Sequence, residues 1–208
     1  MYTLAGSLSD VEVEPGSNLL LLGPAMSGKK RFAYEVLAEG VKNGEGAIVV
    51  SMSNSANRIF ESFSELLGQD PRLVSMGVVD CVSKQQGVEG LDNTEYVKYA
   101  SAPDDMTKIG ISLSEFLEQF NGQQGLERNR ACLDNISTML MYADIQTIFR
   151  FLHVFTGRVQ NVDGLGIYLM DPSAHDTQTV NTLKGLFDGI IEADEAAESG
   201  FTYAGVDM

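Results

Sequence analysis

The stretch LLLLGPAMSGK, which covers residues 19–29, decides the fold of this chain. Its four leucines form a continuous apolar run, which is typical of a strand buried on both faces. The run leads into the pattern GxxxxGK, and apolar residues at helical spacing follow over residues 29–41. A glycine-bearing turn between a strand and a helix can direct backbone N–H groups and the positive helix end toward an anion. The stretch therefore predicts a phosphate-binding loop in an α/β domain.

The phosphate-loop prediction includes the cations that follow the glycines. Lys29 is placed to reach the outer phosphates, and Lys30 and Arg31 add two more of the chain's 14 Lys and Arg residues. The alternative is a glycine-bearing turn with a chance cation cluster at a helix start, where the helix dipole disfavours positive charge. The expected ligand is ATP or ADP, and the candidate cofactor-binding residues are Gly23, Pro24, Ala25, Met26, Ser27, Gly28, Lys29, Lys30 and Arg31.

Position 30 departs from the phosphate-loop pattern, which has Ser or Thr there to coordinate Mg²⁺. Lys30 cannot coordinate a cation, because its ammonium group is itself positive. Either the metal is held without this ligand, or Lys30 replaces part of its charge. We expect Lys30 to contact phosphate directly, so that nucleotide binding depends little on Mg²⁺.

Segments of strand type and helix type alternate along the rest of the chain. Strands separated by helices need crossover connections, which predict a mostly parallel sheet flanked by helices. No internal repeat or Pro/Gly-rich linker divides the sequence, so we expect one α/β domain over 1–208, with its core over 14–195. Further strands are expected at 47–50, 77–82, 96–100, 130–133, 165–170, 189–191 and 201–206, and helices at 59–67, 107–120, 145–159 and 177–187.

A phosphate-loop enzyme also uses an Asp at the end of a buried strand to hold its metal ion. Two residues fit this requirement, Asp134 after the strand at 130–133 and Asp171 after the strand at 165–170. Either residue could instead cap a turn or a helix. Spacing alone leaves the choice between them open.

With these motifs, the chain resembles the KaiC-like branch of the RecA-fold ATPases, in particular compact single-domain members of salt-loving archaea that are sometimes described as transducer-like. The resemblance spans about residues 14–195. It rests on EPGSNL at 14–19, TKIGIS at 107–112 and LDNISTML at 133–140. It implies a single RecA-like phosphate-loop domain, and it favours Asp134 as the Walker B residue that holds the metal.

The same resemblance places a pair of catalytic glutamates where this chain has Ser53 and Asn54, and residues 51–60 hold no acid. Without a carboxylate at Asn54 to orient the attacking water, hydrolysis is expected to be slow. The resemblance thus implies a nucleotide-binding regulator or scaffold for signal transduction, with weak or lost ATPase activity. One alternative is an active ring-forming homo-oligomer that uses residues at subunit interfaces. Another is a protein-interaction module that no longer binds nucleotide; the protein partner is left open.

The amino-acid composition limits which binding partners and which cellular compartment are expected. The 208 residues include 29 Asp and Glu and carry a formal net charge of −15. Such a surface repels nucleic acid. It suits a cytoplasm of high salt, where the repulsion among the acidic groups is screened. The alternative explanation of the charge is an ordinary acidic protein from a cytoplasm of normal salt. The chain shows neither a membrane-spanning apolar run nor a signal peptide, so we expect a cytoplasmic protein. Cys81 and Cys132 are expected to be buried hydrophobes rather than a disulfide.

Overall fold

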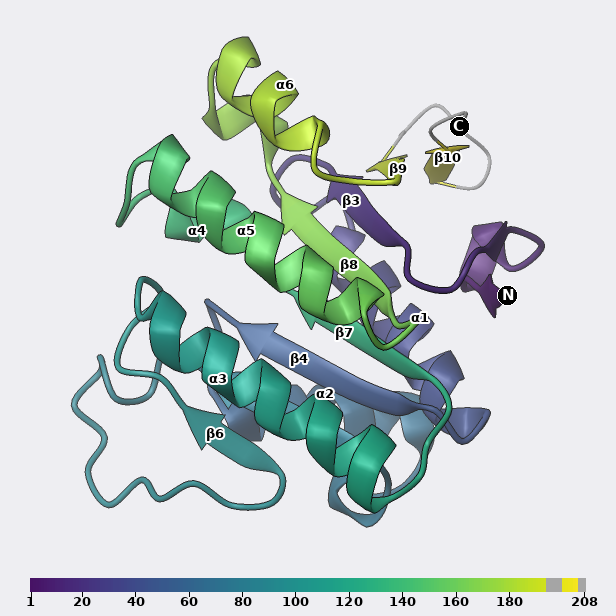
Figure 1. Ribbon diagram of the computed structural model, residues 1–208, viewed down its shortest axis with the longest axis vertical. Coiled ribbons are helices and arrows are strands. Elements are labelled where there is room, and N and C mark those ends of the chain that lie inside the picture. The colour runs from purple at the N-terminus through teal and green to yellow at the C-terminus, as the bar shows by residue number, and fades with distance from the viewer. Residues whose placement is uncertain (194–199, 206–208) are drawn as a thin grey trace.

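A sheet runs through the centre of the structure, a computed structural model that describes residues 1–193 and 200–205 (Figure 1). Its strands are β3 (Asn18–Leu22), β4 (Gly46–Ser51), β5 (Met76–Asp80), β6 (Val97–Tyr99), β7 (Asn129–Leu133), β8 (Leu165–Met170), β9 (Gly189–Ala193) and β10 (Phe201–Gly205). Within the described residues this sheet has the order β10-β9-β3-β8-β7-β4-β5-β6. All neighbouring pairs are parallel except β9 and β10. The predicted α/β class with a mostly parallel sheet is confirmed.

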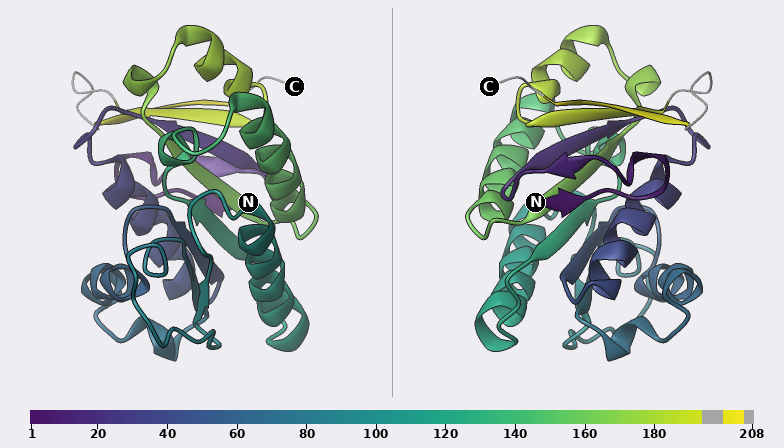
Figure 2. Two further views of the ribbon diagram at one scale, coloured as in Figure 1. Left: turned by 90° about the vertical axis from the view of Figure 1, so that its left-hand side faces the viewer. Right: turned by 90° about the vertical axis from the view of Figure 1, so that its right-hand side faces the viewer.

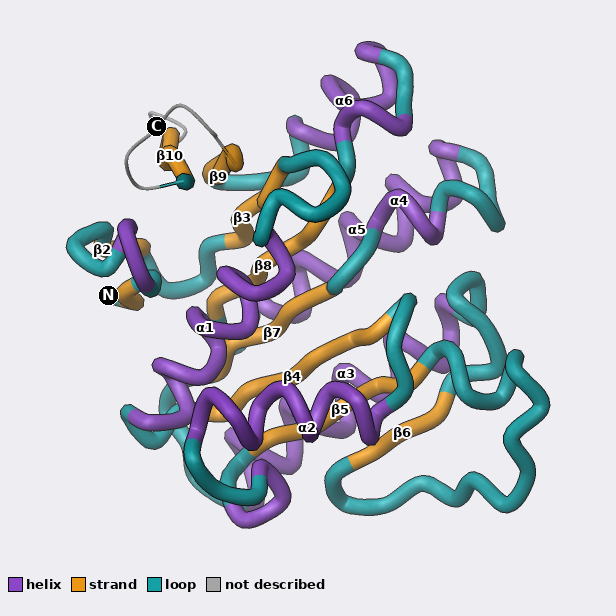
Figure 3. Tube along the Cα trace, turned by 180° about the vertical axis from the view of Figure 1, so that it is seen from behind, coloured by secondary structure: helices purple, strands orange, loops and turns teal. Residues whose placement is uncertain are grey.

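Helices cover both faces of the sheet, as Figure 2 shows from two sides. The helices are α1 (Lys29–Lys42), α2 (Ala56–Leu67), α3 (Met106–Leu117), α4 (Ile136–Met139), α5 (Ile145–Gln160) and α6 (Thr177–Lys184). One apolar cluster joins α1 and α2 to one face, and these helices lie in front of the sheet in Figure 3. A second cluster joins α3, α4, α5 and α6 to the other face. The central strands read as apolar runs because both of their faces are buried.

Several elements differ from the expectation. A two-stranded antiparallel sheet of β1 (Tyr2–Thr3) and β2 (Glu12–Val13) precedes the phosphate loop and was not expected. The helix expected at 107–120 ends at Leu117 and continues as a π-helix over Glu118–Gln123. The expected tail strand is present as β10; position 206, like positions 194–195 of the expected core, lies outside the described residues.

Two further expectations concern the cysteines and the membrane. Cys81 and Cys132 are free and buried, as the apolar runs around them predicted. Among the described helices, none combines the length and the apolar character that crossing a bilayer requires.

The parallel direction of the strands brings the candidate residues to one edge of the sheet. The carboxyl ends of β3, β8, β7 and β4 are neighbours at this edge. They lead, respectively, into the glycine loop, Asp171, Asp134 and the segment that holds Ser53 and Asn54. Residues that are far apart in the sequence are thereby gathered at the start of α1.

Candidate functional site

The loop between β3 and α1 is a tight turn that requires glycine at its two ends. Gly23 donates its N–H to Met170 O at 3.2 Å, and a Cβ on Gly23 would lie only 2.5 Å from Ser27 Oγ. Gly28, directly before α1, has a left-handed backbone with φ of 81°, a conformation that glycine adopts without steric cost. Met26 also has a positive φ, 64°, and its side chain is fully exposed. The strand–loop–helix arrangement expected for the GxxxxGK pattern is thus present.

A cavity of about 370 Å³ opens beside this loop, at the carboxyl ends of the strands. Cavities of this size hold small-molecule ligands, and open α/β sheets bind ligands at this edge. The cavity is lined by Met26, Ser27, Gly28, Lys29, Lys30, Ser53, Asp134, Asn135 and Leu169. Most of the residues singled out from the sequence therefore meet around one space.

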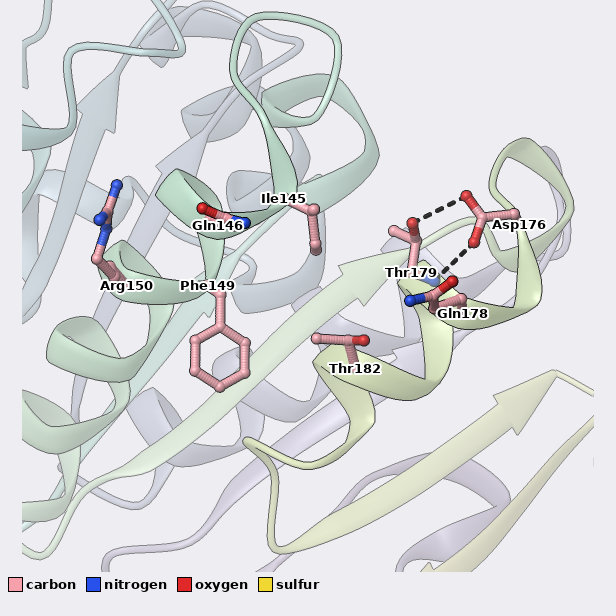
Figure 4. A pocket seen from close by; sticks show the side chains of 8 residues that line it. All are labelled: Ile145, Gln146, Phe149, Arg150, Asp176, Gln178, Thr179 and Thr182. Atoms are coloured by element: carbon pink, nitrogen blue, oxygen red, sulfur yellow. Dashed lines mark hydrogen bonds between the residues drawn. The ribbon is translucent and has the colours of Figure 1, made fainter.

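A larger cavity, of about 610 Å³, lies between α5 and α6 and does not include the candidate residues (Figure 4). Its lining consists of Ile145, Gln146, Phe149, Arg150, Asp176, Gln178, Thr179 and Thr182. Asp176 accepts hydrogen bonds from the N–H and the hydroxyl of Thr179, at 2.8 and 3.0 Å. These bonds cap the start of α6, so they have a structural role of their own.

Lys29, the first residue of α1, lies back against the loop. Its Nζ donates to Pro24 O at 2.8 Å. Burial lowers the pKa of Lys29; the carboxylate of Asp171 opposes this shift, and the charge of Lys30 adds to it. An anion in the neighbouring cavity would favour the charged form of Lys29.

Lys30 lines the cavity, and its ammonium group is bound by acceptors of the protein itself, which the sequence did not predict. Its Nζ lies 2.6 Å from Asp134 Oδ2 and donates to Ser53 Oγ at 2.7 Å. In the amide orientation that gives both groups of Asn54 a partner, the Asn54 oxygen accepts from Lys30 Nζ at 3.0 Å. An ammonium group has three protons, so each finds an acceptor within the protein. The buried carboxylate, which Coulomb attraction makes the strongest acceptor nearby, explains this direction.

Asp134 follows β7, and its side chain is fully buried. Its Oδ1 accepts from Met52 N–H at 2.7 Å. Its Oδ2 accepts from the hydroxyls of Ser51 and Ser53 at 3.1 and 3.3 Å, in addition to its contact with Lys30. Both oxygens of the carboxylate are therefore already bound by protein donors.

The residues around Asp134 do not fit Mg²⁺, the metal that the Walker B resemblance implies. Mg²⁺ requires oxygen ligands in near-octahedral geometry. Here Lys30 supplies a positive charge in place of the Ser or Thr hydroxyl, and the same ammonium contacts the carboxylate. In the part of the chain that the structure describes, no cluster of three or more His, Cys, Asp or Glu residues could hold a metal ion.

Two other candidate residues, Asp171 and Arg31, are not among the residues that line the cavity. Asp171 accepts from the N–H and the hydroxyl of Ser173 at 2.9 and 2.6 Å, and these bonds lower the pKa of Asp171. Arg31 is 81% exposed and pairs with Glu35, Nε to Oε1, at 2.9 Å. Of the three cations in the first turn of α1, Lys29 and Lys30 line the cavity and Arg31 does not.

The sequence interpretation missed a second buried carboxylate, Asp80 at the end of β5. It accepts from the backbone N–H groups of Ala56, Val82 and Ser83 at 2.8, 2.9 and 2.9 Å. The hydroxyl of Ser83 also donates to it at 2.7 Å. Asp80 therefore joins the start of α2 to the end of β5. Its place near the end of an apolar run was the available signal, the same one that indicated Asp134.

The comparisons with known proteins agree with this fold. The model of DUF7504, a family of unknown function, matches residues 16–193. Among solved structures, the uncharacterized protein PH0321 from Pyrococcus horikoshii, in complex with an unknown peptide, is similar at a TM-score of 0.68 and 14% identity, over 92% of this chain and 83% of that chain. The KaiC-like protein PH0186 from Pyrococcus horikoshii OT3 is similar at a TM-score of 0.62 and 14% identity, over 93% and 80%. These likenesses show a RecA-like fold. No curated protein matches the chain significantly.

Proposed function

This chain belongs to the DUF7504 family, and we propose that it is a KaiC-like regulatory protein that binds ATP or ADP and hydrolyses it slowly or not at all. The observation that carries the proposal is the cavity of about 370 Å³ between the glycine loop and the carboxyl ends of the strands. The loop, the start of α1 and Lys29 all border it. This arrangement offers backbone donors, a helix dipole and a cation to a polyphosphate.

Slow hydrolysis follows from the residues on the opposite side of the cavity. Ser53 and Asn54, at the positions where the resemblance implies glutamates, are acceptors for Lys30. Asp134 is the acid among the residues that line the cavity, and its oxygens are bound by protein donors. No lining carboxylate is therefore placed to orient water, and phosphoryl transfer to water is fast only where a residue positions or deprotonates the attacking water.

A protein that binds nucleotide without rapid turnover can act as a regulator, because the bound nucleotide shifts the population of its conformations. We propose this role in signal transduction, in a cytoplasm of high salt, which the net charge of −15 supports. A second candidate is a protein-interaction module. The peptide in the structure of the neighbour PH0321 favours it.

A nucleotide titration tests the proposal. Thermal stability and calorimetric binding would be measured with ATP and ADP in molar KCl for the wild type, Lys29→Ala and the control Lys42→Ala, at the far end of α1. Nucleotide at a 100-fold excess over Kd should stabilise the wild type by about 2.7 kcal/mol. Lys29→Ala should lose most of this gain, and Lys42→Ala should keep it.

Two outcomes would contradict the proposal. If no nucleotide stabilises the wild type, with or without Mg²⁺, the interaction module is favoured. If the wild type releases phosphate at about 1 per second or faster, within the usual range of enzymes, other residues perform the hydrolysis.

A further inference from the structure

We propose that Lys30 replaces the metal ion of this site, so that the site takes nucleotide polyphosphate free of Mg²⁺. The inference rests on the proposed nucleotide binding and specifies the state of its ligand. It is carried by the direct contact of 2.6 Å between Lys30 Nζ and Asp134 Oδ2. Asp134 is the residue that would otherwise hold the metal.

The contact disfavours Mg²⁺ at Asp134. The ammonium and Ser53 Oγ both lie on Oδ2, and Met52 N–H takes Oδ1 at 2.7 Å. A divalent cation on the same carboxylate would lie beside the positive charge of Lys30, and like charges at such distances repel strongly in a partly buried site. The carboxylate is also fully buried, so water screens this repulsion little.

The departures at positions 30, 53 and 54 form one network. Ser53 Oγ and the Asn54 oxygen complete the contacts of the ammonium at 2.7 and 3.0 Å. With glutamates at positions 53 and 54, the side chains at 30, 53, 54 and 134 would together carry a net negative charge. A divalent cation would then be needed to offset the repulsion between this charge and an anionic ligand. With Ser and Asn, the single charges of Lys30 and Asp134 cancel. The network is thus neutral without a metal.

An aromatic ring also holds Lys30 in this position. The centroid of the Tyr34 ring lies 5.9 Å from Lys30 Nζ, and Tyr34 is buried. The face of an aromatic ring attracts a cation. Within the described residues, the side chain of Lys29 makes one hydrogen bond, from Nζ to the carbonyl oxygen of Pro24 in the loop. Lys29 is therefore the cation that remains for the phosphates.

The first experiment uses the wild type alone. Affinities for ATP and ADP would be measured by calorimetry in EDTA and in millimolar Mg²⁺. The proposal predicts the same Kd in both buffers, within about threefold. A loss of affinity in EDTA of about tenfold or more would overturn it.

The second experiment uses the metal alone and does not depend on nucleotide binding. Mn²⁺ would be titrated against the wild type, Lys30→Thr and the control Lys42→Thr, and the free ion would be measured by electron paramagnetic resonance. Lys30→Thr supplies a hydroxyl and frees Asp134, so it should bind Mn²⁺ at least about tenfold more tightly than the wild type. Lys42→Thr removes a charge from the same helix and should behave as the wild type. The double variant Lys30→Thr/Asp134→Asn should lose the gain.

The outcomes separate the two proposals. If the wild type binds Mn²⁺ as tightly as Lys30→Thr does, the replacement of the metal is wrong, whether or not nucleotide binds. If no form binds nucleotide but Lys30→Thr gains Mn²⁺ binding, the nucleotide proposal fails and the role of Lys30 at Asp134 stands. If Lys30→Thr does not fold, the wild type decides, and binding of millimolar Mn²⁺ by the wild type would overturn the inference.

Discussion

The two ends of β7 each carry an ion pair, and the two pairs are built differently. At the amino end, Arg130 Nε lies 2.5 Å from Glu45 Oε2, and the side chains are 1% and 7% exposed. At the carboxyl end, the Lys30 side chain is 32% exposed while that of Asp134 is fully buried. One pair is closed off from water, and the other borders a cavity.

The amino-end pair has the properties of a structural contact. Arg130 Nη1 donates to Thr3 O and to Val36 O, both at 2.8 Å, and Nη2 donates to Glu45 Oε1 at 3.3 Å. The planar guanidinium thereby joins β1, α1 and the sheet with fixed geometry. Lysine at the carboxyl end is a flexible point charge with one side toward solvent. The comparison fits a stabilising role for the pair at the amino edge of the sheet and the binding role that we propose for the carboxyl edge.

Breaking the amino-end pair should have the largest effect. Glu45→Gln leaves the buried guanidinium without its counter-charge, and we expect a loss of about 3–5 kcal/mol in the free energy of unfolding. Denaturant unfolding measures it. In the double variant Glu45→Gln/Arg130→Met, part of the loss should return, because no charge is then buried alone. If Glu45→Gln lost less free energy of unfolding than Lys30→Ala, the distinction between the two ends of β7 would be wrong.

Breaking the carboxyl-end pair should cost less. Lys30→Ala leaves Asp134 with three neutral donors, and we expect a loss of about 1–3 kcal/mol. This loss should shrink from dilute to molar KCl, because salt screens the charge of Lys30, whose side chain is 32% exposed, whereas the loss in Glu45→Gln should stay constant. The wild type should itself become more stable over this range, because its net charge of −15 is screened. Losses that respond to salt equally at both ends would contradict the comparison.

The smallest expected effect is a loss of local stability in acid at the first turn of α5, at the carboxyl edge of the sheet. Asp144 caps α5 there, and the hydrogen bonds from Thr147 lower its pKa below the ordinary 3.8. Its contribution to stability is therefore complete above 3.8 and is lost as the pH falls through the lowered pKa. Asp144→Asn keeps a capping side chain but cannot titrate. The hydrogen-exchange protection factors in the first turn of α5, which are corrected for the intrinsic exchange rate at each pH, should fall in acid in the wild type and change less in the variant; an equal fall in both would contradict this role.

Much of the fold could be predicted because its signals are local. The run at 19–22, the glycines at 23 and 28 and the helical spacing after Lys29 lie within one short segment. The places of Asp134 and Asp171 at strand ends were also evident. Bounds were less accurate where the helix geometry changes, as at Leu117, where a π-helix begins.

The contacts that distinguish the two ends of β7 could not be predicted. Arg130 was interpreted as part of an apolar strand, and its partner Glu45 lies 85 positions away in the sequence. Lys30 was expected to face phosphate, since its position next to Lys29 suggested no other acceptor. Neither the apolar run around Arg130 nor the cation cluster that contains Lys30 indicates which distant side chain will pair with the cation.

The sequence by itself determined the alternation of strands and helices along the chain from residue 18 onward, the glycine loop and the absence of acidic side chains at Ser53 and Asn54. Only the tertiary structure decided that Lys30 pairs with Asp134 at the wall of the cavity, and that Arg130 pairs with Glu45. The physical reason is that periodicity and turn geometry depend on neighbours in the chain, whereas the partner of a charge depends on which strands become neighbours in the sheet. The order of the strands places β7 beside β4, and so brings Asp134 to Ser51, Met52 and Ser53.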